Sequence, residues 1–196
     1  IWIGTFQGIT VLNVNKEVVK KFTHDPKDPF SITGNKVYDI IQHSDGTIWV
    51  STDSGINRYD ESANQFTRFV HNDENENSLS ANVVRRLLED KEGRIWIATE
   101  NGGLDILDQK TYAFHHFIEN KTSRTSISDI SLYSIYRDQL DNMWVGTNAQ
   151  GVSFYDRHAK PFVVYQSSPG VKGALQYEKI NGLDEQPGKG IWLSTE

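Results

Sequence analysis

The five tryptophans of this 196-residue chain recur at intervals of 47, 47, 48 and 48 residues. Each is followed by an apolar residue, then a small residue, then a threonine. The five phrases are Trp2-Ile3-Gly4-Thr5, Trp49-Val50-Ser51-Thr52, Trp96-Ile97-Ala98-Thr99, Trp144-Val145-Gly146-Thr147 and Trp192-Leu193-Ser194-Thr195. A fixed period of this length is typical of proteins in which one supersecondary unit is stacked several times. We therefore expect about four copies of one structural unit.

The extra residue of the longer repeats lies in one turn. Gly8 and Gly55 follow their tryptophans by six residues, whereas the matching Gly103 and Gly151 follow by seven. Surface turns accept an added residue at little cost. We therefore expect this insertion to leave the rest of the repeat in phase.

Each repeat predicts four short strands. The first is an apolar or β-branched run that ends in a tight turn, with Gly46, Gly93 or Asp141 where the backbone needs a positive φ. The second carries the tryptophan and is apolar without alternation, which indicates burial on both faces. The third follows the turn glycine, and the fourth carries two aromatic residues three apart. The expected first strands are 37–42, 84–89 and 132–137, the third strands are 56–60, 104–108 and 152–156, and the aromatic pairs are Phe66 and Phe69, Phe114 and Phe117, and Phe162 and Tyr165.

Four strands in a unit of this length are the signature of a β-propeller blade. We predict an all-β fold with about four blades of four antiparallel strands, as a sector of a larger ring. The small residue two after each tryptophan is expected to leave space for a large ring from the adjacent blade. The expected units are 1–30 (strands two to four of a first blade), 31–77, 78–125, 126–173, and 174–196 (the first two strands of a fifth).

The composition limits the partners. A formal net charge of −6, with scattered basic residues, argues against nucleic acid as a partner, because phosphate binding needs clustered Lys and Arg. No apolar stretch approaches the roughly 20 residues of a membrane span, and no signal segment opens the chain, so we expect no direct membrane contact by this segment. The absence of cysteine excludes disulfides and Cys-ligated metal sites.

One stretch carries a family resemblance. Residues 90–99 (Asp-Lys-Glu-Gly-Arg-Ile-Trp-Ile-Ala-Thr), the following Gly103-Leu104, and the linking residues 77–83 resemble the two-component regulator propeller repeat. The resemblance implies the periplasmic, extracytoplasmic sensor region of a hybrid two-component histidine kinase. In such proteins two seven-bladed propellers and an immunoglobulin-like module precede the membrane, and the signal is commonly an oligosaccharide. The resemblance thus implies that this chain is a sector of a seven-bladed propeller.

Other propeller classes fit less well. Recurrent Gly-His and Trp-Asp pairs are absent, and the Asp boxes of sialidases need a spacing that the adjacent Asp45 and Gly46 do not have. We find no converging set of acids, bases or metal ligands, so we expect no catalytic residue, no metal and no cofactor. His24 and His71 share one phase of the repeat and are expected to be structural, whereas His43 and His158 have no evident partner. The acidic residues 72–77 lack the spacing of a calcium loop.

A ligand should bind where loops of several blades converge. In propellers, the loops that lead into the innermost strand share a face with those that join the second and third strands. Residues there that differ between blades are our candidates, because Tyr and Arg suit a sugar ring, a uronate or a sulfate. The candidates are Asn35, Lys36 and Tyr38 in one blade, Asn82, Arg85 and Arg86 in the next, and Ser131 and Tyr133 in the third.

We therefore expect an extracytoplasmic ligand-sensing segment with no chemistry of its own. The expected partners are an oligosaccharide and the remaining blades and second propeller of the same chain, and a homodimer stays open. Two alternatives also stay open, namely the propeller of a secreted polysaccharide-active enzyme and a structural spacer.

Overall fold

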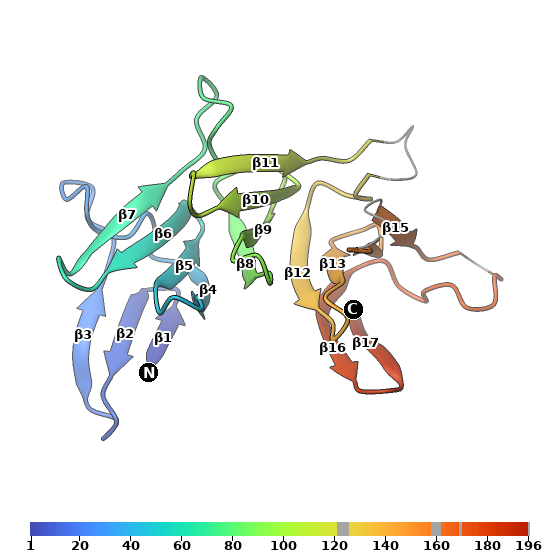
Figure 1. Ribbon diagram of the computed structural model, residues 1–196, viewed down its shortest axis with the longest axis horizontal. Helices are drawn as coiled ribbons and strands as arrows, with labels where there is room; N and C mark the ends of the chain where they lie inside the picture. Colours follow the sequence, from blue (N-terminus) through green and yellow to red (C-terminus); the bar gives the residue numbers. More distant parts are fainter. Residues whose placement is uncertain (121–125, 158–161, 169, 196) are drawn as a thin grey trace.

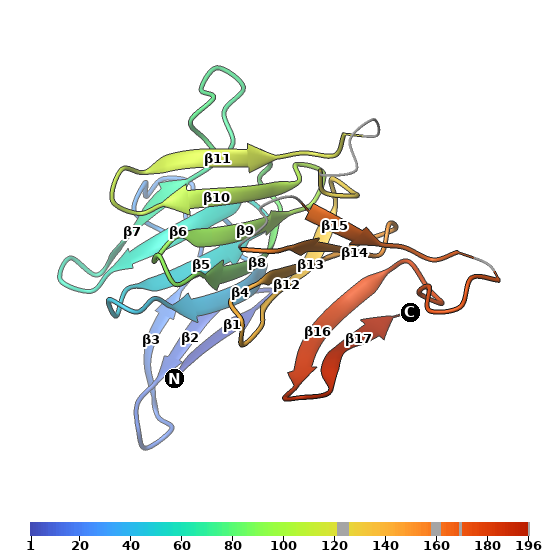
Figure 2. The same ribbon diagram turned by 45° about the vertical axis from the view of Figure 1, so that its right-hand side comes forward.

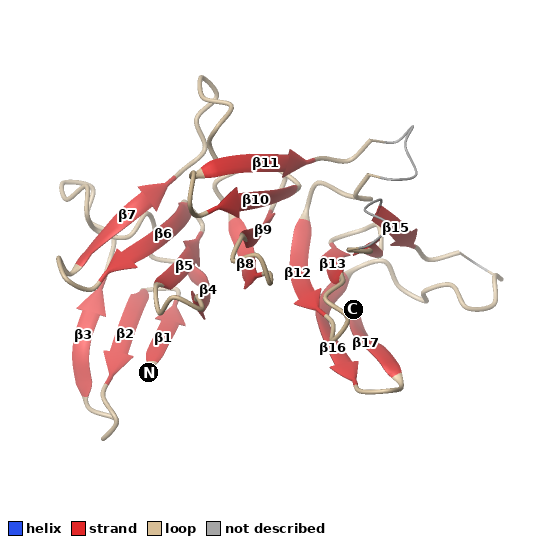
Figure 3. Cartoon of the chain, viewed as in Figure 1, coloured by secondary structure: helices blue, strands red, loops and turns tan. Residues whose placement is uncertain are grey.

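The computed structural model describes residues 1–120, 126–157, 162–168 and 170–195, and this part of the chain forms strands and no helix (Figure 3). The strands are β1 (Trp2–Thr5), β2 (Gly8–Leu12), β3 (Val18–Phe22), β4 (Val37–Gln42), β5 (Ile48–Thr52), β6 (Gly55–Asp60), β7 (Gln65–Phe69), β8 (Val84–Glu89), β9 (Ile95–Thr99), β10 (Leu104–Asp108), β11 (Ala113–Phe117), β12 (Leu132–Arg137), β13 (Met143–Thr147), β14 (Val152–Tyr155), β15 (Phe162–Tyr165), β16 (Ile180–Gln186) and β17 (Gly190–Thr195).

These strands form five antiparallel sheets that follow one another along the chain. The orders are β1-β2-β3, β4-β5-β6-β7, β8-β9-β10-β11, β12-β13-β14-β15 and β16-β17. The sheets stand side by side as a fan, with β7 and β11 along its outer edge (Figure 1). Strand β4 contacts β8, β8 contacts β12, and β12 contacts β16, which Figure 2 shows beside the fourth sheet. The predicted fold class, a run of four-stranded propeller blades, is confirmed.

The core lies between neighbouring sheets. Three apolar clusters fill the spaces between the first and second, second and third, and third and fourth sheets. Trp49 and Trp96 are 0% and 1% exposed, as the apolar second strands predicted. Burial of about 200 Å² of indole stabilises the fold by up to about 5 kcal/mol. Trp192, in the two-stranded last sheet, is 65% exposed, so the predicted burial of the tryptophan strand is confirmed at Trp49 and Trp96 and is wrong at Trp192.

At Gly4 and Gly146 the side chain from the adjacent blade is aliphatic, so the prediction of an aromatic ring is wrong at these two positions. A Cβ on Gly4 would lie 2.6 Å from Cγ1 of Val37, and one on Gly146 would lie 2.8 Å from Cγ2 of Ile180. Val37 and Ile180 begin the innermost strands of the following sheets. A β-branched side chain in an innermost strand thus needs a small neighbour across the blade boundary.

The turn positions have the predicted backbone. Gly46 and Gly93 have φ of 90° and 77°, and Asp141 has φ of 71°. The buried carboxylate of Asp141 is surrounded by cations: Nζ of Lys91 lies 3.6 Å away, and Arg157 donates a hydrogen bond to it.

The predicted blade boundary between 125 and 126 stays a prediction, because residues 121–125 lie outside the described part.

Candidate functional site

A β-bulge occurs near the start of every innermost strand that the structure describes. The pairing of β4 with β5 passes from Val37 to Asp39 and leaves out the residue between them, and the same shift occurs in β8, β12 and β16. Bulges re-aim a side chain and are frequent next to functional sites. The bulged residues all lie eleven positions before a tryptophan, and they are Tyr38, Arg85, Tyr133 and Asn181.

Three of the bulged side chains form a stacked row across neighbouring blades. The guanidinium carbon of Arg85 lies 4.5 Å from the ring centroid of Tyr38 and 5.0 Å from that of Tyr133. Phe6 extends the row at one end, with its ring centroid 6.0 Å from that of Tyr38. Lys179 extends it at the other end, with Nζ 5.8 Å from the Tyr133 ring. Five successive sheets or their linkers thus contribute one side chain each to what we call the inner row.

Charged residues of the second-to-third-strand turns meet this face of the fan. Glu100, which follows β9, accepts a hydrogen bond from Nη2 of Arg85. Asp53, which holds the same position after β5, lies with Oδ2 3.9 Å from Nζ of Lys36. These contacts bear out the expectation that the two kinds of loop share one face.

The other candidates have structural contacts. Oδ1 of Asn35 accepts the backbone N–H of His24, and Oδ1 of Asn82 accepts that of His71, so each asparagine ties down its own linker. Nη1 of Arg86 donates to the backbone oxygen of Tyr38 at 3.1 Å. The hydroxyl of Ser131 donates to Oδ1 of Asn101 in the preceding turn at 2.9 Å. The structure thus brings Tyr38, Arg85 and Tyr133 together. The other four candidates hold linkers or neighbouring blades in place, and they are Asn35, Asn82, Arg86 and Ser131.

Two ionisable groups at the inner row have shifted pKa values. Burial lowers the pKa of Arg85, but the hydrogen bond and charge of Glu100 outweigh this effect and raise it. Burial raises the pKa of Asp39, which the N–H of Leu87 and the charge of Arg86 only partly offset. The guanidinium of Arg85 is thus a permanent cation held in a half-buried aromatic environment.

Sequence reasoning missed Phe6, Glu100, Asp53 and Lys179. A signal for three of them was present, because Phe6, Asp53 and Glu100 each directly follow the threonine of a tryptophan phrase. That position differs between blades as much as the bulged position does. Lys179 lies two residues before the bulged Asn181, at the same phase of the repeat as the candidates Lys36 and Ser131, so a signal for it was present as well.

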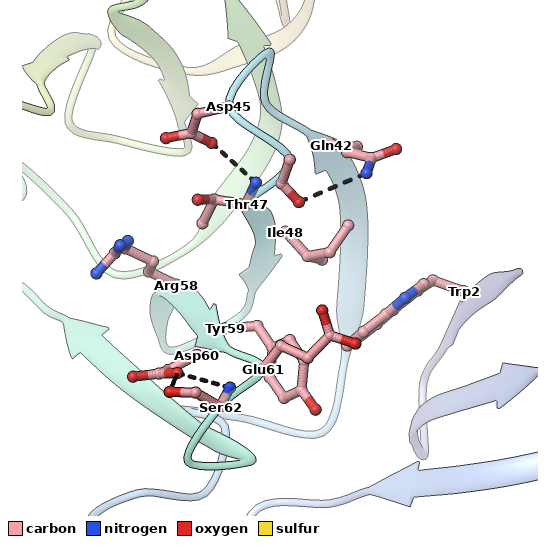
Figure 4. Close-up of a pocket in the computed structure, with 11 residues that line it drawn as sticks. Trp2, Gln42, Asp45, Thr47, Ile48, Arg58, Tyr59, Asp60, Glu61 and Ser62 are labelled. Carbon is pink, nitrogen blue, oxygen red and sulfur yellow. Dashed lines mark hydrogen bonds between the residues drawn. The ribbon is translucent and has the colours of Figure 1, made fainter.

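One cavity of about 600 Å³ lies on the opposite face, among turns that include Asp45–Thr47 and Asp60–Ser62 (Figure 4). Figure 4 shows Trp2 and Tyr59 at its wall, with the carboxylates of Asp45 and Asp60 turned to their own turns. One blade along, the same position is filled, because Ser44 donates to the carboxylate of Glu89. The cavity lies between Trp2 of the first sheet and two turns of the second sheet.

The histidines have structural partners. Nδ1–H of His24 and of His71 donates to a linker carbonyl at 2.8 and 2.6 Å, in keeping with their shared phase. The prediction that His43 has no partner is wrong, since Nε2 lies 3.0 Å from Oε1 of Glu89 in the next blade. His158 lies outside the described residues. Among the described residues, no group of three or more His, Asp or Glu side chains is placed to hold a metal ion, and no helix could cross a membrane.

His116, on the outer strand of the third blade, is partly exposed and forms an ion pair with a buried aspartate. Its Nδ1 lies 2.7 Å from Oδ1 of the fully buried Asp105. Oδ2 of Asp105 accepts the N–H and the hydroxyl of Ser80, in the linker before the same blade. The hydrogen bond with Asp105 raises the pKa of His116 to about 9. This pair fixes the linker and lies away from the inner row.

Comparisons with known proteins agree with this architecture. The two-component regulator propeller family matches residues 31–54, 78–101 and 126–149, each of which covers a linker, an innermost strand and a tryptophan strand. A search of curated proteins gave no match.

Solved structures show the same fold. The extracellular domain of the putative hybrid two-component system BT4673 from B. thetaiotaomicron is 18% identical, with a TM-score of 0.77 over 99% of this chain and 26% of that one. The corresponding domain of BT3049 from the same organism is 20% identical, with a TM-score of 0.55 over 99% of this chain and 30% of that one. PorZ, a surface component of the type-IX secretion system of Porphyromonas gingivalis, is 14% identical, with a TM-score of 0.71 over 100% of this chain and 29% of that one.

The chain thus spans less than a third of the length of these structures. The family match recurs once in each of the three complete blades and includes the bulged strand and the tryptophan phrase each time. Residues 31–54, 78–101 and 126–149 thus match the two-component regulator propeller repeat, and they lie in consecutive blades of a β-propeller.

Proposed function

We propose that this chain is an extracytoplasmic ligand-sensing segment of a two-component signalling protein, and that its ligand is an oligosaccharide. The observation that carries the proposal is the inner row, which lies within the family's repeats and varies from blade to blade as Tyr38, Arg85 and Tyr133. Structurally equivalent positions with different side chains suit recognition, because recognition needs an asymmetric surface on a regular scaffold.

The row offers charge and ring edges to a ligand. The faces of Tyr38 and Tyr133 that point along the row are covered by Arg85, so a sugar would meet their edges and hydroxyl groups. The half-exposed Lys36 stands beside the row and adds a further donor. Binding through Arg85, Tyr38 and Tyr133 is the central part of the proposal, and Asn35, Asn82 and Arg86 act by holding the linkers and the row in place.

The signalling role is proposed from the proteins in which similar propeller structures occur. Two similar structures are extracellular domains of putative hybrid two-component systems. On that basis we propose a periplasmic location, as part of a protein whose kinase activity lies elsewhere. The segment has no chemistry of its own and signals by a change of domain or dimer geometry. Such a change requires that the ligand bind one state more tightly than the other.

Calorimetric titration with a panel of glycan fragments tests the proposal. We expect one class of fragment to bind, and we expect Tyr133→Ala to weaken that binding at least tenfold, which corresponds to about 1.4 kcal/mol. The matched control is Tyr165→Ala, which removes a half-exposed tyrosine from the outer strand β15 and should leave binding unchanged. Silence across the panel would favour a structural spacer, and turnover of a fragment would favour an enzyme.

A further inference from the structure

The head group of Arg85 is fixed by neighbours on both sides. Tyr38 and Tyr133, which belong to the preceding and following blades, hold the guanidinium at 4.5 and 5.0 Å from their ring centroids. Such contacts hold a cation in position without using its N–H donors. The position of Arg85 therefore does not depend on the carboxylate that it meets.

That carboxylate belongs to Glu100, at the start of a turn that is one residue longer than in the two preceding blades. The N–H of Thr99 bonds to the carbonyl of Gly103 at 3.1 Å, whereas in the shorter turn Thr52 pairs with Gly55. The side chains of Arg85 and Glu100 are 25% and 29% exposed. Ion pairs that water can reach contribute little to stability, so this contact can be exchanged for another at low cost.

Arg85 has more donors than Glu100 uses. A guanidinium carries five N–H groups and prefers to bind a carboxylate or sulfate through two parallel hydrogen bonds. Glu100 accepts from Nη2, and Nε of Arg85 is buried without a hydrogen-bond partner among the described residues. The pair seen here is therefore a single-donor contact at a group suited to a bidentate one.

We propose that Glu100 occupies an anion site on Arg85 and that the ligand of the inner row is an acidic sugar, whose carboxylate or sulfate displaces Glu100. This inference rests on the proposed function and adds the chemical class of the ligand. Lys36 and Lys179, at the two ends of the same face, add to the positive potential that an anion would meet. The exchange of one anion for another leaves the net charge around Arg85 unchanged, which avoids an unpaired half-buried cation.

Titration of the purified protein with glucuronate, glucose 6-sulfate and glucose tests this inference. Glu100→Gln removes the competing charge and should tighten binding of the two anions by up to about fivefold, the value of one exposed ion pair. Binding of glucose should not change. The control is Glu61→Gln, which also removes one carboxylate but lies on the opposite face of the fan, at the cavity of Figure 4.

The outcomes separate the two proposals. Tighter anion binding by Glu100→Gln but not by Glu61→Gln supports the inference, and the anion with the larger gain identifies uronate or sulfate ester as the natural group. Equal gains in both variants, or no gain in either, overturn it. If the glycan panel still yields a neutral fragment that depends on Tyr133, the proposed function stands while this inference fails. If nothing binds in either experiment, both fail.

Discussion

Nε1 of Trp96 donates a hydrogen bond of 2.9 Å to Oδ2 of Asp90, six residues earlier in the chain. Asp138 accepts from Trp144 in the same way at 3.0 Å. His43 stands at this position in the second blade, and Nε1 of the buried Trp49 has no hydrogen-bond partner among the described residues. The aspartate thus joins the turn between the first two strands to the indole at the blade centre.

Asp90→Ala is expected to lower the free energy of unfolding by about 3 kcal/mol, because it leaves a buried indole N–H and two turn N–H groups without their acceptor. Asp138→Ala should have a similar effect. Asp45→Ala is the control and should cost about 1 kcal/mol, because this exposed carboxylate in the corresponding turn of the second blade accepts the N–H of Thr47 and no indole N–H. Urea unfolding measures all three, and equal losses at Asp90 and Asp45 would contradict the role given to the Asp90 carboxylate.

Gly146→Ala is expected to lower the free energy of unfolding by about 1–3 kcal/mol through overpacking. The new Cβ would lie 2.2 Å from Oγ of Ser134 and 2.8 Å from Cγ2 of Ile180, and Ile180 is fully buried. Gly182→Ala is the control, because its Cβ would lie 3.6 Å from the nearest side chain. Thermal unfolding should separate the two variants, and a neutral Gly146→Ala would show that the blade boundary can relax.

The strands could be predicted because their causes are local. An apolar run indicates a strand that is buried on both faces, and a glycine at the expected position indicates a tight turn. Both patterns recur in each repeat. The predicted strands 37–42, 84–89, 132–137 and 104–108 are confirmed. The third strand of the second blade begins one residue earlier than predicted, at Gly55, and that of the fourth ends one residue earlier, at Tyr155.

Contacts between blades could not be predicted in the same way. Tyr38, Arg85 and Tyr133 were named because they vary between repeats, but their stacking depends on bulges, and a bulge is a property of strand pairing. The Val37 side chain beside Gly4 and the Glu89 partner of His43 likewise come from the next repeat. A single repeat specifies its own strands, whereas packing between repeats depends on both neighbours.

Asp141→Asn tests the charge cluster at the boundary between the third and fourth blades. Asparagine tolerates the positive φ of this position, so the substitution changes mainly the charge. Arg157 donates hydrogen bonds to both Asp141 and Glu92 and so links the two blades. We expect a loss of about 1–2 kcal/mol at low salt. At 1 M salt the difference from the unsubstituted protein should shrink in part, because salt screens the exposed cations but acts much less on the buried carboxylate of Asp141. A loss that does not change with salt would contradict this origin.

His116 should make stability depend on pH in the alkaline range. The carboxylate of Asp105 raises its pKa from 6.5 in the unfolded chain to about 9 in the folded one, so the folded state binds the proton more tightly. The stabilisation is fully present below about pH 6.5 and is lost as the pH rises towards 9, because deprotonation leaves the buried carboxylate of Asp105 without its cation. His116→Gln should remove this slope from urea-unfolding curves between pH 6.5 and 9, whereas His115→Gln, an exposed neighbour on the same strand, should retain it. The same slope in both variants would assign it to another group.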